Sequence, residues 1–210
     1  MLLRDMFLTD TLLSVLYPQP CRICGGSVER RRFGIACEAC WAAHIYTDNE
    51  PHAIGWYEGA LRETVLQLKR QPYLPQHVVE LIAEASKSFA GVTRVVPVPL
   101  HEERLRSRGF NQAAIIAREM SRALRVPLDE TSLIRVSSTE KHRTGLDAKG
   151  RWDSVADAFV VRYPRLIAGE NVLVVDDVFT TGATVAACEA ALIEAGAKSV
   201  LLMTLARARH

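Results

Sequence analysis

Residues 172–185 read VLVVDDVFTTGATV, and they constrain the fold more than any other part of the chain. The apolar, mostly β-branched run at residues 172–175 is typical of a strand buried on both faces of a parallel sheet. A turn of small residues follows, and then a helical pattern over residues 185–195. A strand, a loop and a helix N-terminus in this order place a ligand site at the carboxyl end of a parallel sheet.

The same segment carries the groups that bind a ribose 5-phosphate. Asp176 and Asp177 supply carboxylates that accept hydrogen bonds from sugar hydroxyls. Backbone N–H groups of the turn and of the first helical residues have no intrahelical partner, so with the helix dipole they can hold a phosphate. An isolated Asp-Asp pair is more often a turn former, but the coincidence of all these elements favours a binding site. The turn consists of Thr180, Thr181, Gly182, Ala183 and Thr184.

At these residues the chain resembles the type I phosphoribosyltransferases, whose signature is an apolar run, Asp-Asp and then Thr-Thr-Gly-x-Thr. The resemblance implies a site for 5-phosphoribosyl 1-pyrophosphate (PRPP), which carries Mg²⁺ on its pyrophosphate and ribose oxygens. It also implies that Asp176 and Asp177 contact the ribose 2- and 3-hydroxyls. The 5-phosphate would then lie on residues 180–184.

Four of the five cysteines form two Cys-x-x-Cys motifs with twelve residues between them. Two such motifs complete a tetrahedral four-cysteine zinc site, and with no open position such a site is structural rather than catalytic. A disulfide framework is a poorer alternative, because a chain of this length can build its core without cross-links. A redox-active Cys-x-x-Cys pair would leave the second motif unexplained. We expect the fifth, Cys188, to be a buried small residue. The expected ligands are Cys21, Cys24, Cys37 and Cys40.

Bulk properties favour a soluble cytoplasmic protein. Charged residues make up 24% of the chain and the net charge is +2, so charge alone does not indicate nucleic-acid binding. No apolar run approaches the ~20 residues of a membrane span. Charged residues interrupt the first 18 positions and no small-residue cleavage site follows, so we expect an amphipathic helix at residues 1–16 rather than a signal peptide.

Alternating strand and helix patterns predict an α/β fold with a mostly parallel sheet flanked by helices. We divide the chain into an N-terminal helix with a zinc module at residues 1–50 and a phosphoribosyltransferase-like domain at residues 51–210. The polar residues 137–150 are expected to form a mobile loop. Strands are expected at residues 53–56, 92–98, 133–136, 158–161, 172–175 and 199–205, and further helices at 58–70, 78–89, 111–124 and 185–195.

Residues 96–113 read VPVPLHEERLRSRGFNQA and give a third signal. The guanidinium groups of Arg104, Arg106 and Arg108 after a strand suit a polyanion such as pyrophosphate, although alternating arginines also occur on solvated surfaces. Together with the cysteine motifs and the Asp-Asp loop, this segment resembles the ComF family of competence-associated, phosphoribosyltransferase-like proteins. The resemblance covers nearly the whole chain.

The ComF resemblance implies roles for individual residues. The segment from Pro99 to Arg108 would form a loop that binds pyrophosphate, and Lys69 would reach a phosphate. Arg104 and Arg108 would stabilise the leaving pyrophosphate while the aspartates hold the ribose, which makes these four the expected catalytic residues. Residues 139–151 would close over PRPP. This loop departs from the family pattern at Arg143 and Ser154, where Gln and Asn are usual, so its hydrogen bonds are left open.

The family resemblance implies a role in natural competence, in the uptake or processing of transforming DNA, with competence-machinery proteins as partners. Two classes of function remain open: an enzyme that transfers phosphoribosyl to an unidentified acceptor, and a non-enzymatic protein that senses PRPP or binds single-stranded DNA. Three arginines at residues 30–32, with Phe33 and Trp41, supply basic and aromatic groups for DNA. A solvated hairpin tip and aromatic packing around zinc are the more frequent meaning of such a pattern.

Overall fold

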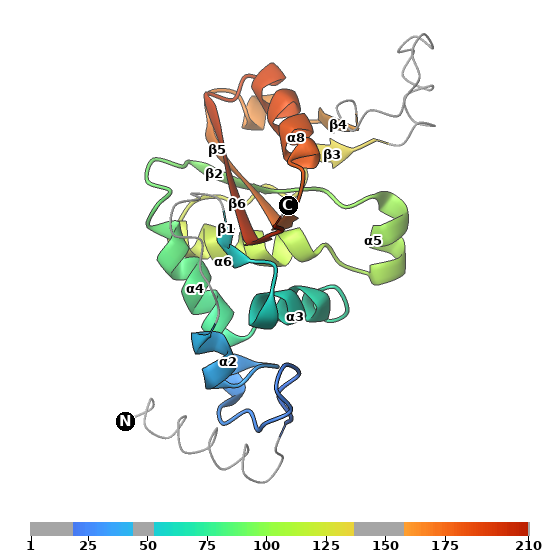
Figure 1. Ribbon diagram of the computed structural model, residues 1–210. Helices are drawn as coiled ribbons and strands as arrows, with labels where there is room; N and C mark the ends of the chain where they lie inside the picture. Colours follow the sequence, from blue (N-terminus) through green and yellow to red (C-terminus); the bar gives the residue numbers. More distant parts are fainter. Residues whose placement is uncertain (1–18, 44–52, 137–157, 210) are drawn as a thin grey trace.

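A computed structural model describes residues 19–43, 53–136 and 158–209 (Figure 1). Four parallel strands form the central sheet in the order β1-β6-β5-β2, and an antiparallel pair, β3 and β4, lies apart from it. The mostly parallel sheet that the sequence predicts is therefore confirmed. The strands are β1 (Ala53–Trp56), β2 (Arg94–Pro97), β3 (Leu133–Arg135), β4 (Phe159–Val161), β5 (Asn171–Phe179) and β6 (Ser199–Arg207).

Helices cover both faces of the central sheet (Figure 1). Alternation along β5 sends Leu173 and Val175 into a core with α3, α4 and α6, while Val172 and Val174 pack against α8 on the other face. Within the described residues, no helix is both long and apolar enough to cross a membrane. The helices are α2 (Glu38–Ala42), α3 (Gly59–Leu68), α4 (Gln76–Ser86), α5 (Glu102–Arg108), α6 (Gln112–Leu124) and α8 (Ala183–Glu194), with short 3-10 helices η1 (Arg31–Phe33) and η3 (Pro164–Leu166).

Strand β5 is longer than the apolar run predicts. It continues through Asp176 and Asp177 to Phe179, because β6 extends beside it and the parallel pairing runs on from Asp176 opposite Thr204 to Phe179 opposite Arg207. The two acids are therefore strand residues instead of loop residues. Only the turn after Phe179 leaves the sheet.

The arginine segment is a helix, α5, where the sequence analysis expected a loop. The ring nitrogen Nδ1 of His101 accepts a hydrogen bond from the N–H of Glu103 at the start of this helix. Glu102 ion-pairs with Arg106 one turn later. Acidic residues in the first turn and arginines in the last favour the helix through its dipole, and Gly109 ends it with φ +81°.

Residues 19–43 pack on α4 and share its core. The rings of Phe33 and Trp41 meet the ring of His77 edge-on, with centroids 5.1 and 4.8 Å away. Buried side chains from these residues join those of α3 and α4 in one continuous cluster. The helix expected at residues 1–16, the loop at 137–150 with Arg143, and Ser154 lie outside the described residues.

Candidate functional site

The Asp-Asp pair lies near the carboxyl end of β5, where Lys69 reaches it from the C-terminal end of α3. Lys69 Nζ is 3.2 Å from Asp177 Oδ2, and the N–H of Asp177 donates to Asp176 Oδ1 at 2.8 Å. Asp177 is buried, with 7% of its surface exposed. The structure therefore brings together three expected site residues from α3 and β5, two elements that are distant in the sequence.

The environment of Asp176 disfavours a second negative charge. Burial, followed by the charge of Asp177, raises the pKa of Asp176 to about 8, although the nearby Lys69 ammonium opposes this. Burial and then the Asp176 carboxyl raise the pKa of Cys188, on α8, to about 12. The pair therefore holds close to one negative charge at neutral pH, and a ligand that donates hydrogen bonds or carries a cation would favour its full ionisation.

The raised pKa of Asp176 predicts a stability that falls as pH rises. In the folded state this carboxyl stays protonated up to about pH 8, whereas in the unfolded chain it ionises near its ordinary value of 3.8. Between these values the folded state binds the extra proton, so stability is lost as pH rises through this window. We expect Asp176→Asn to raise the melting temperature at pH 8 and to flatten its decline between pH 5 and 9. Thermal unfolding across this range measures both, and a parallel decline in parent and variant would contradict the assignment.

The turn after β5 leads into a helix N-terminus that its own N-cap residue leaves uncapped. Gly182 is the N-cap of α8 with φ +78°, it has no side chain to cap this end, and the first turn holds no acidic residue. Thr181 Oγ1 accepts a long hydrogen bond, 3.5 Å, from the backbone nitrogen of Ala183. A Cβ at position 182 would approach Phe179 Cζ to 3.0 Å, so the positive φ favours glycine and a larger residue would also crowd the Phe179 ring. Such a helix start is suited to an anion.

Phe179 supports this turn, and the sequence analysis did not single it out. Its ring lies under Gly182 on one side, while the Arg207 guanidinium carbon is 5.0 Å from the ring centroid. The signal in the sequence is slight: one aromatic residue stands between the Asp-Asp pair and the Thr-Thr-Gly turn. Packing of this ring holds the turn against the ends of β5 and β6.

The arginines of α5 differ in their partners. Arg106 is engaged by Glu102, and Arg108 donates to Gln112 Oε1. Among the described residues, Arg104 has neither an ion-pair nor a hydrogen-bond partner for its side chain. The amide of Asn111 donates to the carbonyl of Val98 at 2.9 Å, which ties together the two ends of the connection that contains α5.

A cleft of about 840 Å³ lies beside this connection, between α5, α6 and β3. Pro97, Pro99 and Leu105 contribute to its lining. The aspartates and residues 180–184 do not line it. The cleft thus borders the segment expected to bind pyrophosphate without covering the acid pair, and its presence alone does not define the site.

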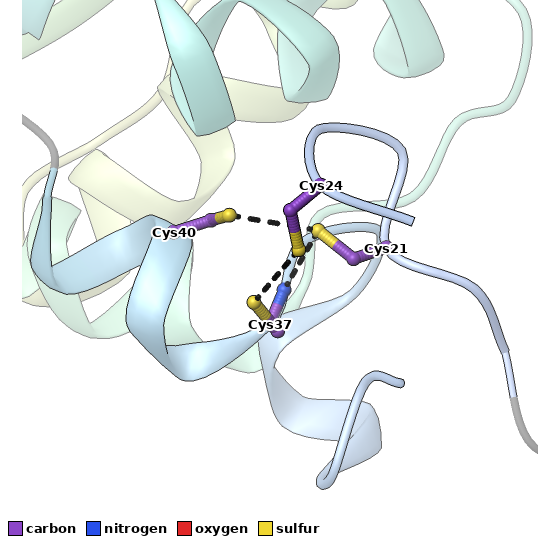
Figure 2. A group of neighbouring side chains, drawn as sticks. All are labelled: Cys21, Cys24, Cys37 and Cys40. Carbon is purple, nitrogen blue, oxygen red and sulfur yellow. Dashed lines mark hydrogen bonds between the residues drawn. The ribbon is translucent and has the colours of Figure 1, made fainter. Parts of the chain in front are cut away.

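The four cysteines of the two motifs converge on one point (Figure 2). Their sulfur atoms all lie within 4.8 Å of one another, and the Cys21–Cys40 and Cys24–Cys37 Sγ distances are both 3.7 Å. Zinc–sulfur bonds of about 2.3 Å in a tetrahedron require sulfurs about 3.8 Å apart. The thiols are free, and this group can hold a zinc ion.

Backbone groups prepare the cluster for thiolates. The N–H of Cys37 donates to Cys21 Sγ at 3.4 Å. Burial acts to raise the pKa of Cys21, but backbone hydrogen bonds outweigh it and lower the pKa to about 6. Burial and the neighbouring sulfurs raise the pKa of Cys40. Because four thiolates this close repel one another, the arrangement calls for a cation among them.

The aromatic residues between and after the motifs are packing residues. Phe33 and Trp41 are 6% and 2% exposed, and the indole N–H of Trp41 donates to the Phe33 carbonyl at 2.9 Å. The Arg32 guanidinium pairs with Glu80 on α4. The interpretation of Trp41 as packing near the metal module is therefore confirmed, and Phe33 is buried beside it. Stacking of DNA bases on these rings would require the core to open.

Comparison with protein families matches residues 64–210 to the phosphoribosyl transferase domain. This match includes Lys69, the α5 arginines, the Asp-Asp pair and the turn that follows. It covers more than half of the chain. The cysteine motifs lie before the matched region.

Among curated proteins, the chain is 35% identical over 114 residues to the DNA utilization protein YhgH of Escherichia coli K12, covering 54% of this chain and 49% of the relative. It is 35% identical over 115 residues to competence protein F of Haemophilus influenzae, covering 54% and 50%. It is 32% identical over 114 residues to competence protein ComFC of Bacillus subtilis, covering 54% and 44%. The match thus spans about half the length of these relatives.

Proposed function

The chain belongs to the phosphoribosyl transferase domain family, in the ComF group, and on that premise we propose that it binds PRPP with Mg²⁺ at the carboxyl end of β5. One observation carries the proposal. A carboxylate pair, with Asp177 buried and Asp176 half-buried, is separated by only a short turn from a helix N-terminus that has no acidic residue in its first turn, so sugar hydroxyls and a phosphate of one molecule can be held together.

In this proposal each group has a distinct task. The aspartates accept hydrogen bonds from the ribose hydroxyls, and the N–H groups of residues 180–184 bind the 5-phosphate. Arg104 and Arg108 attract the pyrophosphate, with Arg106 on the same helix adding positive charge. Pro99 begins the connection that carries them. Mg²⁺, brought by PRPP, would neutralise part of the pyrophosphate charge.

Transfer would proceed by departure of pyrophosphate from ribose carbon 1 while an acceptor bonds to that carbon. The guanidinium groups of α5 stabilise the negative charge that develops on the leaving oxygen. The carboxylates fix the ribose as carbon 1 becomes positively charged. The acceptor is a separate molecule, and the alternative is a protein that binds PRPP as a signal without transfer. Release of pyrophosphate on addition of an acceptor distinguishes these two.

The names of the relatives support a role in natural competence, in uptake or processing of transforming DNA. In this proposal competence-machinery proteins and single-stranded DNA are partners, and the protein works in the cytoplasm. The four-cysteine group holds a structural zinc ion. We retain the proposed division into an N-terminal module at residues 1–50 and a phosphoribosyltransferase-like domain at residues 51–210.

Calorimetric titration with PRPP and Mg²⁺ tests the binding site. We expect Asp177→Asn to weaken the affinity for PRPP at least tenfold, because an amide oxygen is a weaker acceptor than a carboxylate for the ribose hydroxyls. Glu189→Gln is the matched control, since Glu189 is an exposed acid on α8 and should leave the affinity within twofold. Equal affinity in parent and Asp177→Asn, or no binding by the folded parent, would overturn the proposal.

A further inference from the structure

Lys69 fills the place beside Asp177 where a cation would bind. The side chain of Asp177 is 9% exposed, and its Oδ2 accepts no well-formed hydrogen bond within the described part of the chain. The ammonium of Lys69 lies 3.2 Å from this oxygen. The oxygen therefore depends on this ammonium for its charge balance, and loss of that cation leaves a buried carboxylate uncompensated.

The two members of this pair differ in how firmly they are held. Asp177 belongs to β5, which pairs with β6 at Asp176 and Val178, on either side of this residue, and with β2 up to Val175. Lys69 is the C-cap residue of α3, its N–H is bound to the Val65 carbonyl at 3.1 Å, and its side chain is 34% exposed. A four-carbon stem that borders solvent lets the ammonium leave while the backbone stays in place.

The charge at this place limits which ligands can enter. A free divalent ion gains little from a carboxylate that is already neutralised, and Lys69 repels it. A sugar phosphate brings hydroxyl donors for Asp177 and phosphate oxygens for Lys69, so both members of the pair find new partners when it enters. A free metal ion that displaced Lys69 from Asp177 would leave the ammonium without a new acceptor, whereas a sugar phosphate supplies phosphate oxygens to accept its hydrogen bonds.

We propose that Lys69 is a displaceable internal counter-ion for Asp177, which excludes a free divalent cation from the carboxylate pair and moves to a ligand phosphate when the sugar phosphate binds. The inference rests on the proposed PRPP site and names the residue that sets its order of binding. In this proposal Mg²⁺ enters the site bound to PRPP, and the carboxylate pair does not bind the free ion beforehand. Lys69 thus decides which cation neutralises Asp177 before the ligand arrives.

Binding of Mn²⁺ alone, as a spectroscopic substitute for Mg²⁺, tests the proposal by electron paramagnetic resonance at pH 8. The parent should bind Mn²⁺ weakly, whereas Lys69→Met should gain one site at least tenfold tighter, because the carboxylates lose their resident cation. Lys87→Met is the matched control: it removes a lysine whose ion pair with Glu84 is exposed on both sides, and it should behave as the parent does. Lys69→Met with Asp177→Asn should lose the new site.

Three outcomes would overturn the proposal: tight Mn²⁺ binding by the parent, no gain in a Lys69→Met variant with parent-like circular dichroism, or a gain that survives Asp177→Asn. None of these measurements contains PRPP. Failure of the counter-ion role is therefore distinct from failure of the binding site, which the calorimetric titration of the parent detects separately.

Discussion

Replacing Cys37 with serine should release the metal and lower the melting temperature by about 10 °C, on the scale of about 2–4 °C per kcal/mol for a chain of this size. Cys37 is 4% exposed, and its sulfur faces Cys24 at 3.7 Å within the four-cysteine group. A serine hydroxyl is a poor zinc ligand, and the remaining three thiols would lose the cation that offsets their mutual repulsion. Because metal binding to such modules is coupled to folding, the stability of the module is lost with the ion.

Metal analysis and calorimetry measure the two parts of this expectation. The parent should contain one zinc per chain, and the Cys37→Ser protein should contain much less than one. Cys188→Ala is the matched control, since it also removes a buried cysteine but lies on α8, away from the cluster. It should be destabilised by its own cavity while retaining its zinc. Full zinc content in Cys37→Ser, or zinc loss in Cys188→Ala, would contradict the assignment of the ligands.

The loss of stability in Cys37→Ser should extend beyond the metal module, because the module shares its core with the helices that support the candidate site. Trp41 and Phe33 join Leu61 and Leu68 of α3 in one buried cluster. Helix α3 in turn ends at Lys69, which contacts Asp177. The cysteine module thus shares the core that supports the helix ending at Lys69. The coupling runs through packing alone, so a metal ion at the cysteines need not contact the sugar phosphate.

Local patterns in the sequence predicted the features that neighbouring residues determine. The buried run of β5, the glycine turn at Gly182 and the paired Cys-x-x-Cys motifs depend on residues close together in the chain, and each occurs where expected. The helix α5 was missed, although its signal is also local: acidic residues precede arginines by one turn. That pattern was interpreted as a set of phosphate ligands or as a solvated surface, and the helix was overlooked.

Features set by distant residues could not be predicted. The length of β5 depends on pairing with β6, which carries the two acids into the sheet. The contact of Lys69 with Asp177 joins residues that are close only after α3 packs on the sheet. The position of His77 between the rings of Phe33 and Trp41 likewise depends on docking of the module on α4. Sequence spacing contains none of these distances.

The packing of residues 19–43 on α4 predicts a large loss of stability when a single methyl group is added at Gly34. This residue has φ +70°, and a Cβ built there would lie 2.4 Å from Pro75 Cγ and 2.9 Å from Pro75 Cβ. The ring of Pro75, the N-cap residue of α4, cannot rotate away, because it is closed onto the backbone nitrogen. Gly34, with ψ −115°, lies outside the left-handed helical region, so Gly34→Ala should cost about 1–3 kcal/mol for the backbone conformation and about 1–3 kcal/mol more for the overlap.

Gly91→Ala separates the two contributions. Gly91 has φ +84°, but a Cβ there meets nothing within 4 Å, so this variant bears the conformational cost alone. We expect Gly34→Ala to lower the melting temperature several degrees more than Gly91→Ala, and to retain its zinc because the cysteines are unchanged. Equal shifts in the two variants would mean that Pro75 is not packed tightly against the module. A larger shift with zinc retained would show that docking on α4 contributes stability separately from metal binding.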